Sequence, residues 1–225
     1  MIYKLLTLAA CGISALAVIY GAVRLFVENT PRYLQLYILA AACYFMEGLW
    51  TVCNSFFGLG TGDGLLSIRL VGLFGCFCFM LSANANEFDG LVDERRGEGR
   101  RARRLSLMAP VVLTAVLAGY IALNRSALTP LRAAILFFSF LPALPASYYN
   151  LKHLLLPMDT MRYLERTRKI NFLALLFYTG IFSCVALQTF AGAWLRYTMN
   201  VFLSCVVLCI SVVCVREAAK WKAAV

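Results

Sequence analysis

The segment Leu91–Leu105 reads LVDERRGEGRRARRL and is the longest charged interruption in a chain that is otherwise mostly apolar. Apolar runs of about 20 residues, long enough to span a bilayer, flank it on both sides. A charge-dense turn between two such runs is a loop, and its arginines mark the cytoplasmic side by the positive-inside rule. The six arginines are Arg95, Arg96, Arg100, Arg101, Arg103 and Arg104. This segment therefore predicts both a membrane protein and its orientation.

The composition of the whole chain agrees with a membrane location. Apolar residues make up 62% of the 225 residues and the mean hydropathy is +0.78, whereas soluble domains are about 45–50% apolar. Spans of about 20 residues leave room for seven or eight crossings and for no soluble catalytic or DNA-binding domain. The net charge of +10 falls mostly beside the apolar runs. It therefore indicates topology and attraction to anionic lipids at the cytoplasmic face rather than a nucleic-acid partner.

We expect an all-α fold, a seven-transmembrane-helix bundle with its N-terminus outside and its C-terminus in the cytoplasm. The bundle forms a single domain over residues 1–225, in the cytoplasmic membrane of a bacterium. The expected helices cover about 5–26, 33–57, 65–86, 106–124, 132–151, 171–191 and 196–215. Two basic cytoplasmic loops, 87–105 and 152–170, separate them. In this topology sixteen basic side chains lie inside, and four lie outside: Lys4, Arg125, Arg132 and Arg196.

The first apolar run contains Ala15-Leu-Ala17, which has the pattern of a signal-peptidase site. Cleavage there would leave the arginine segment outside after two further crossings. Six arginines outweigh one lysine in setting the orientation, so we expect the run to be retained as the first helix.

Metal, redox and catalytic chemistry have little support in the sequence. All nine cysteines lie in apolar runs, none forms a CxxC pair, and His153 is the single histidine. The cysteines are interpreted as small packing residues. The seventh expected helix has no lysine for retinal, and zinc hydrolases need several histidines. The sequence therefore predicts no catalytic residue, no metal site, no cofactor and no enzyme activity.

Ionisable residues within the spans are the strongest candidates for a functional site, because each costs about 2.5–3.5 kcal/mol to insert. Glu47 lies deepest, and Arg69 lies near the outer end of the third expected helix. The two could form a structural ion pair, belong to a ligand or ion site, or leave Arg69 to snorkel toward the interface. Four polar or amphipathic residues are predicted to share the same outer half, opening a pocket outward: Trp50, Asn54, Gln188 and Asn200.

The fifth expected helix contains Pro142 and Pro145. Proline removes a backbone donor and clashes with the preceding turn, so we expect a kink or local unwinding there. The two prolines are candidate hinge residues.

The layout resembles the seven-helix sensory regions at the N-termini of bacterial histidine kinases and related signalling proteins. The similarity rests on the turn from Arg24 to Thr30-Pro-Arg32, on Cys43-Tyr-Phe-Met-Glu-Gly-Leu-Trp50, and on Ile68-Arg-Leu-Val-Gly-Leu-Phe74 with Asn86-Glu-Phe88. It covers the first three helices, and the rest by helix count alone. Such regions usually feed a kinase or cyclase domain, whereas ten residues follow the last expected helix. Either a separate partner carries the output or the chain is part of a longer protein.

Two functions follow from these features. The first is a membrane sensor that binds a small or lipidic ligand from the outer side and signals through its basic loops to a cytoplasmic partner. In this function the six arginines dock lipid or that partner. The alternative is a small-solute transporter with a site near Glu47 and a hinge at Pro142 and Pro145.

Overall fold

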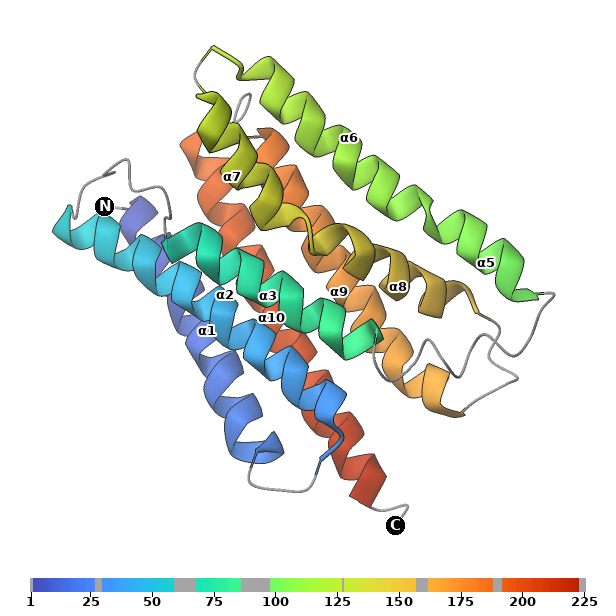
Figure 1. The fold of residues 1–225 in the computed structure, drawn as a ribbon. Coiled ribbons are helices and arrows are strands. Elements are labelled where there is room, and N and C mark those ends of the chain that lie inside the picture. The colour runs from blue at the N-terminus through green and yellow to red at the C-terminus, as the bar shows by residue number, and fades with distance from the viewer. Residues whose placement is uncertain are drawn as a thin grey trace.

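The computed structural model describes residues 2–26, 30–58, 68–85, 98–126, 128–156, 162–187 and 192–222. All regular secondary structure in these ranges is helical (Figure 1). In chain order the helices are α1 (Ile2–Leu25), α2 (Arg32–Phe57), α3 (Ile68–Ala85), α5 (Glu98–Ser106), α6 (Met108–Leu123), α7 (Pro130–Phe140), α8 (Ala143–Leu155), α9 (Arg162–Leu187) and α10 (Ala193–Lys222).

Six stretches of the described chain are long and apolar enough to cross a bilayer. They are Ile2–Leu25, Arg32–Phe57, Arg100–Leu123, Pro130–Leu155, Thr167–Leu187 and Trp194–Lys220. Two of them join consecutive helices, α5 with α6 and α7 with α8. A further apolar helix, Leu70–Ala85 within α3, is shorter. The all-helical prediction is confirmed for the described residues, and their helix lengths and composition are those of a multi-pass membrane protein.

The helices differ from the expected ranges mainly where the chain is basic. The sequence predicts a loop over residues 98–105, but these residues lie in α5, and α9 begins at Arg162, inside the second expected loop. Arginine, alanine and glutamate are good helix formers, so charge alone does not end a helix. The hydrogen bond from Leu107 N to the Arg103 carbonyl and that from Val111 N to the Leu107 carbonyl, 3.3 Å each, continue the helical pattern from α5 into α6.

One end of the bundle carries the N-terminus, the end of α2 and the start of α10; we call it the N-terminal end (Figure 1). Tyr3 stacks on Tyr197 there with 5.0 Å between ring centroids. Lys4 lies 5.2 Å from the ring centroid of Phe56. The C-terminus lies at the opposite end, which we call the C-terminal end.

The pairs α2 with α3 and α1 with α10 have the most extensive contacts in the bundle. Gly72 permits the first of these. A Cβ at Gly72 would lie 2.8 Å from the Cys43 carbonyl oxygen and 3.2 Å from the Glu47 nitrogen. Because real Cβ atoms do not approach backbone so closely, only glycine fits this position, and the backbone of α2 at Glu47 packs directly on α3.

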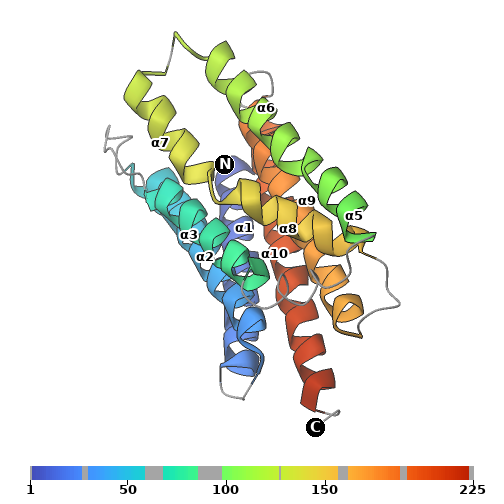
Figure 2. The same ribbon diagram turned by 45° about the vertical axis from the view of Figure 1, so that its right-hand side comes forward.

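The predicted break at the prolines is present. α7 starts at a Thr129 cap, whose hydroxyl accepts a hydrogen bond of 3.3 Å from Arg132 N, and it ends at Phe140. Leu141 and Pro142 form a turn before α8, as Figure 2 shows. Pro145 lies in the first turn of α8, where a missing N–H costs little. The two prolines therefore divide one membrane-length segment into two helices, and their role as a hinge stays a prediction.

An aromatic cluster fills the centre of the bundle. Phe77 of α3 lies 5.6 Å from Phe140 of α7 and 5.8 Å from Tyr178 of α9, measured between ring centroids. Phe140 also meets Phe182 edge to face at 5.1 Å. These packed rings lie between two polar regions, one toward each end of the bundle.

Candidate functional site

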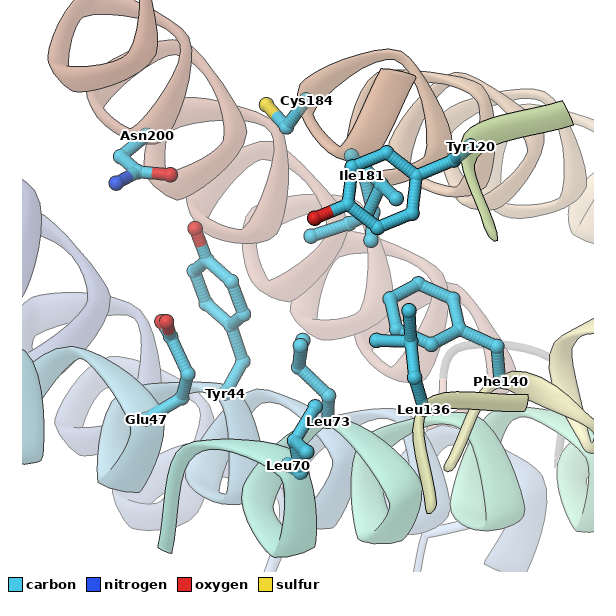
Figure 3. A pocket seen from close by; sticks show the side chains of 11 residues that line it. Tyr44, Glu47, Leu70, Leu73, Tyr120, Leu136, Phe140, Ile181, Cys184 and Asn200 are labelled. Carbon is cyan, nitrogen blue, oxygen red and sulfur yellow. The ribbon is translucent and has the colours of Figure 1, made fainter. Parts of the chain in front are cut away.

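A partly open cavity of about 240 Å³ lies toward the N-terminal end of the bundle (Figure 3). Six helices contribute to its wall, namely α2, α3, α6, α7, α9 and α10. The lining residues are Tyr44, Glu47, Leu70, Leu73, Tyr120, Leu136, Phe140, Ile181, Cys184, Val185 and Asn200. Segments far apart in the sequence thus meet around one space.

The polar side of the cavity is built on α2 and α10. Tyr44 and Glu47 are three residues apart on α2 and therefore share one helical face. Figure 3 shows the Glu47 carboxylate, the Tyr44 hydroxyl and the Asn200 amide pointing toward the same side of the cavity. The Tyr44 hydroxyl also lies beside Ser204, which donates a 3.0 Å hydrogen bond to the Asn200 carbonyl oxygen. A carboxylate, an amide and a phenol therefore converge at one side.

Glu47 is held inside the protein, with only 6% of its surface exposed. The tight packing of α2 on Gly72 fixes the backbone beneath it, because the Glu47 nitrogen and Cβ both lie against that glycine. A carboxylate can accept several hydrogen bonds at its two oxygens. Among the lining residues, Glu47 is the one that carries a carboxylate.

The rest of the wall is almost entirely apolar. Leu70 and Leu73 come from α3, Leu136 and Phe140 from α7, and Ile181 and Val185 from α9. Tyr120 of α6 reaches in from the opposite side, and its hydroxyl points into the space (Figure 3). The cavity therefore has an apolar body with a polar group at one side and a single phenol facing it.

This arrangement is suited to binding rather than to covalent chemistry. Small-molecule sites are mostly apolar, with a few polar groups that fix the orientation of the ligand. A dry cavity of about 150 Å³ can hold benzene, and drug-sized ligands occupy about 300–1,000 Å³. At about 240 Å³ this cavity fits a molecule slightly larger than one aromatic ring.

The structure brings together part of the set predicted from the sequence. Glu47 and Asn200 line the same cavity, whereas Trp50 and Asn54, one and two turns further along α2, do not line it. Arg69 lies in the first turn of α3, but its side chain is outside the described residues, as is Gln188 altogether. The pairing of Glu47 with Arg69 stays a prediction.

Sequence reasoning missed three polar or polarisable residues of the wall, namely Tyr44, Tyr120 and Cys184. Tyr44 could have been found, because it precedes Glu47 by three residues and so must lie on the same face. Tyr120 and Cys184 had no such signal, since their helices are placed by tertiary packing alone.

A second polar region lies toward the C-terminal end of the bundle and is fully buried. Asn84 of α3 donates a 2.8 Å hydrogen bond to the Tyr37 hydroxyl, which in turn donates to Asn150 Oδ1 at 3.4 Å. Asn150 donates to the Tyr178 hydroxyl at 3.3 Å, and Asn84 Oδ1 lies 3.3 Å from His153 Nδ1. We call these five residues the buried hydrogen-bond network.

The buried hydrogen-bond network joins α2, α3, α8 and α9. His153 is only 1% exposed, because α8 packs between α3, α5 and α9. Lys152 beside it is equally buried. Hydrogen bonds between side chains in a low-dielectric interior favour one arrangement of the helices that carry them. This network therefore holds α8 in place on the C-terminal side of the break at Pro142.

The basic segment is described from residue 98 onward. Ala102 and Ser106 face the bundle, whereas Arg100, Arg101 and Arg104 are exposed on the other face of α5. Arg103 is half-buried, and Arg95 and Arg96 lie outside the described residues. The part of the arginine segment that can be placed is thus an amphipathic helix.

Within the described residues, no group of three or more His, Cys, Asp or Glu side chains is placed to share a metal ion. All nine cysteines are free thiols, and most are buried or half-buried. The Cys43 side chain, for example, packs on α3 at Gly75.

Comparison of the chain with protein-family models, with curated proteins and with solved structures finds no match.

Proposed function

We propose that this protein is a membrane receptor that binds a small, largely apolar molecule in the cavity at Glu47 and signals to a cytoplasmic partner. The observation that carries the proposal is the cavity itself, in which one buried carboxylate faces an apolar space enclosed by six helices. The resemblance to sensory regions of bacterial histidine kinases supports the same function, and it is the basis on which we propose a bacterial cytoplasmic membrane as the location.

The wall of the cavity defines the chemistry of the ligand. Glu47 accepts hydrogen bonds, so the polar end of the ligand is a donor such as an amine or a hydroxyl. The leucines and Phe140 take the apolar body. An anionic end would face the Glu47 carboxylate and is disfavoured by like-charge repulsion.

The topology proposed for this receptor has seven spans, an outer N-terminus and a cytoplasmic C-terminus. As the seventh span, α3 has 18 residues, which extend about 27 Å, close to the hydrocarbon thickness of about 30 Å. An odd number of spans agrees with termini at opposite ends of the bundle (Figure 1). Arg24, Arg32, the α5 arginines and Arg216 all lie toward the C-terminal end. Their position supports a cytoplasmic location for that end.

A continuous set of contacts leads from the cavity toward the proposed cytoplasmic face. Leu136 and Phe140 of α7 line the cavity, α8 follows after the turn at Pro142, and α8 packs against the basic helix α5. A ligand that shifts α7 would therefore change the contacts that α8 makes with α5. The buried hydrogen-bond network fixes α8, so movement would be concentrated at the turn.

The binding proposal is tested with three probes of similar size, 2-phenylethylamine, 2-phenylethanol and phenylacetate, which end in a cation, a neutral hydroxyl and an anion. Thermal unfolding of the purified protein is followed in detergent. A molecule that binds only the folded state raises Tm with its concentration. We expect the amine to raise Tm most and phenylacetate least, and Glu47→Gln to remove this order.

The control variant is Val112→Leu, on the exposed face of α6 away from the cavity. It should keep the wild-type order of the probes. Equal shifts for all three probes, in the wild type and in Glu47→Gln alike, would contradict the proposed site.

A transporter is the second candidate, and the interrupted helix at Leu141–Pro142 favours it, since broken helices next to a membrane-embedded site are typical of transporters. Uptake of radiolabelled 2-phenylethylamine into proteoliposomes separates the two functions. Accumulation that depends on Glu47 supports transport. Binding without accumulation supports the receptor.

A further inference from the structure

The exposed face of α5 forms a hollow of about 450 Å³ lined by Arg100, Arg101, Arg104 and Leu105. It is far from the cavity at Glu47 and shares no residue with it. Three guanidinium groups line this one hollow, and each carries five donors in a planar fork that matches phosphate oxygens.

The helix that follows gives this cationic hollow an apolar extension. Leu105 is 46% exposed, and Met108 and Val111 of α6 are 57% and 60% exposed. Only 17% of the apolar window in Arg100–Leu123 is buried in the bundle, the lowest share among the six candidate spans of the described chain. An uncovered apolar face therefore begins directly beside the arginines.

The depth of the arginines matches the headgroup level of a bilayer. Arg104 and Leu123 are 19 positions apart, so along the helix axis they are about 28 Å apart. The hydrocarbon core of a bilayer is about 30 Å thick. When α6 spans this core, the arginines of α5 lie at one of its surfaces, where lipid phosphates are.

We propose that this hollow is a binding site for an anionic phospholipid, with its phosphate at Arg100, Arg101 and Arg104 and an acyl chain along Leu105, Met108 and Val111. A free phosphate would use the arginines but not the apolar face. An acidic protein segment would have to lie at the same depth as the lipid headgroups. The combination of charge, apolar face and depth fits a phospholipid.

The first experiment counts the lipids that remain on the protein. The protein is extracted from vesicles of equal parts phosphatidylglycerol and phosphatidylcholine and analysed by native mass spectrometry. We expect the wild type to keep phosphatidylglycerol in preference to phosphatidylcholine. The triple variant Arg100→Gln, Arg101→Gln, Arg104→Gln should lower this preference at least about tenfold, because each basic residue at a membrane surface contributes about 1 kcal/mol.

The matched control removes the same charge from the same end of the bundle. Arg24, Arg32 and Arg216 are exposed there, and none lines the hollow. The triple variant Arg24→Gln, Arg32→Gln, Arg216→Gln should keep the wild-type preference. An equal loss in both triple variants would show general attraction to the surface and would overturn the site.

A second experiment uses only the wild-type protein, so it does not depend on the folding of a variant. Phosphatidylglycerol with a photoreactive diazirine in its acyl chain is mixed into phosphatidylcholine vesicles that contain the protein, and the labelled residues are identified after illumination. Labelling concentrated between Leu105 and Val112 supports the proposal. Labelling spread evenly over the exposed faces of α1 and α6 overturns it, as does protection of the α5 arginines by a soluble polyglutamate peptide without any lipid labelling.

Discussion

Substitution of Gly72 by alanine tests whether the close packing of α2 on α3 positions the cavity. The new Cβ would lie 2.8 Å from the Cys43 carbonyl oxygen and 3.3 Å from the Glu47 Cβ. Both neighbours belong to the α2 backbone or its first side-chain atom, so neither can rotate away. The helices must separate by about 0.6 Å before the closest contact reaches 3.4 Å.

The expected cost follows from overpacking, which destabilises by about 1–3 kcal/mol. Alanine also gains about 0.8–1.0 kcal/mol of helix propensity over glycine, which partly hides this cost. Gly119→Ala separates the two effects, because a Cβ at Gly119 of α6 meets nothing within 4 Å. The two variants share the gain in propensity, so Gly72→Ala should be about 1–3 kcal/mol less stable than Gly119→Ala.

Unfolding of both variants by denaturant in the same detergent measures this difference. A separation of α2 from α3 also moves Glu47 away from Leu70 and Leu73, so binding of 2-phenylethylamine should weaken in Gly72→Ala and remain normal in Gly119→Ala. Equal stability and equal binding in the two variants would refute the packing that the structure describes.

Three further predictions concern other parts of the bundle. Glu47→Gln and Arg69→Leu should each lower thermal stability or probe response while Val112→Leu does neither, and normal behaviour of both charge variants would exclude a role for them. Asn150→Leu breaks hydrogen bonds to two buried tyrosines, so Tm should fall by the equivalent of about 1–3 kcal/mol; an unchanged Tm would mean that the network adds no stability. Pro142→Ala permits helix across the turn between α7 and α8, so the distribution of distances between spin labels on these two helices should become narrower. An unchanged distribution would contradict a hinge at Pro142.

The membrane spans were predictable because lipid leaves the backbone no alternative. Every backbone N–H and C=O in a bilayer must find a partner within the protein, so an apolar run of sufficient length forms a helix. This reasoning placed α1 and α2 within a few residues of their actual bounds. The same reasoning did not predict the helix around Arg104. The positive-inside rule gives the side of the membrane on which this basic segment lies, but it says nothing about the conformation of its backbone.

The candidate site was predictable only in part, because a sequence does not contain the rotation of one helix relative to another. Glu47 was identified by the cost of a buried charge, and that principle needs no knowledge of its neighbours. Asn200 joined it, whereas Trp50 and Asn54, which follow Glu47 by one and two turns of α2, do not line the cavity. Asn150 carried no signal at all, because its partners come from helices far away in the chain.

The most direct test of a ligand site at Glu47 is calorimetric titration of 2-phenylethylamine into the protein in lipid nanodiscs. The wild type should bind one equivalent. Glu47→Gln removes a charged acceptor, whose hydrogen bond is worth about 1.5–3 kcal/mol, so affinity should fall about tenfold or more. Val185→Trp, which fills the cavity from α9, should bind none while keeping the wild-type Tm. Equal affinity in the wild type and both variants would show that the molecule binds elsewhere and that the cavity is not the site.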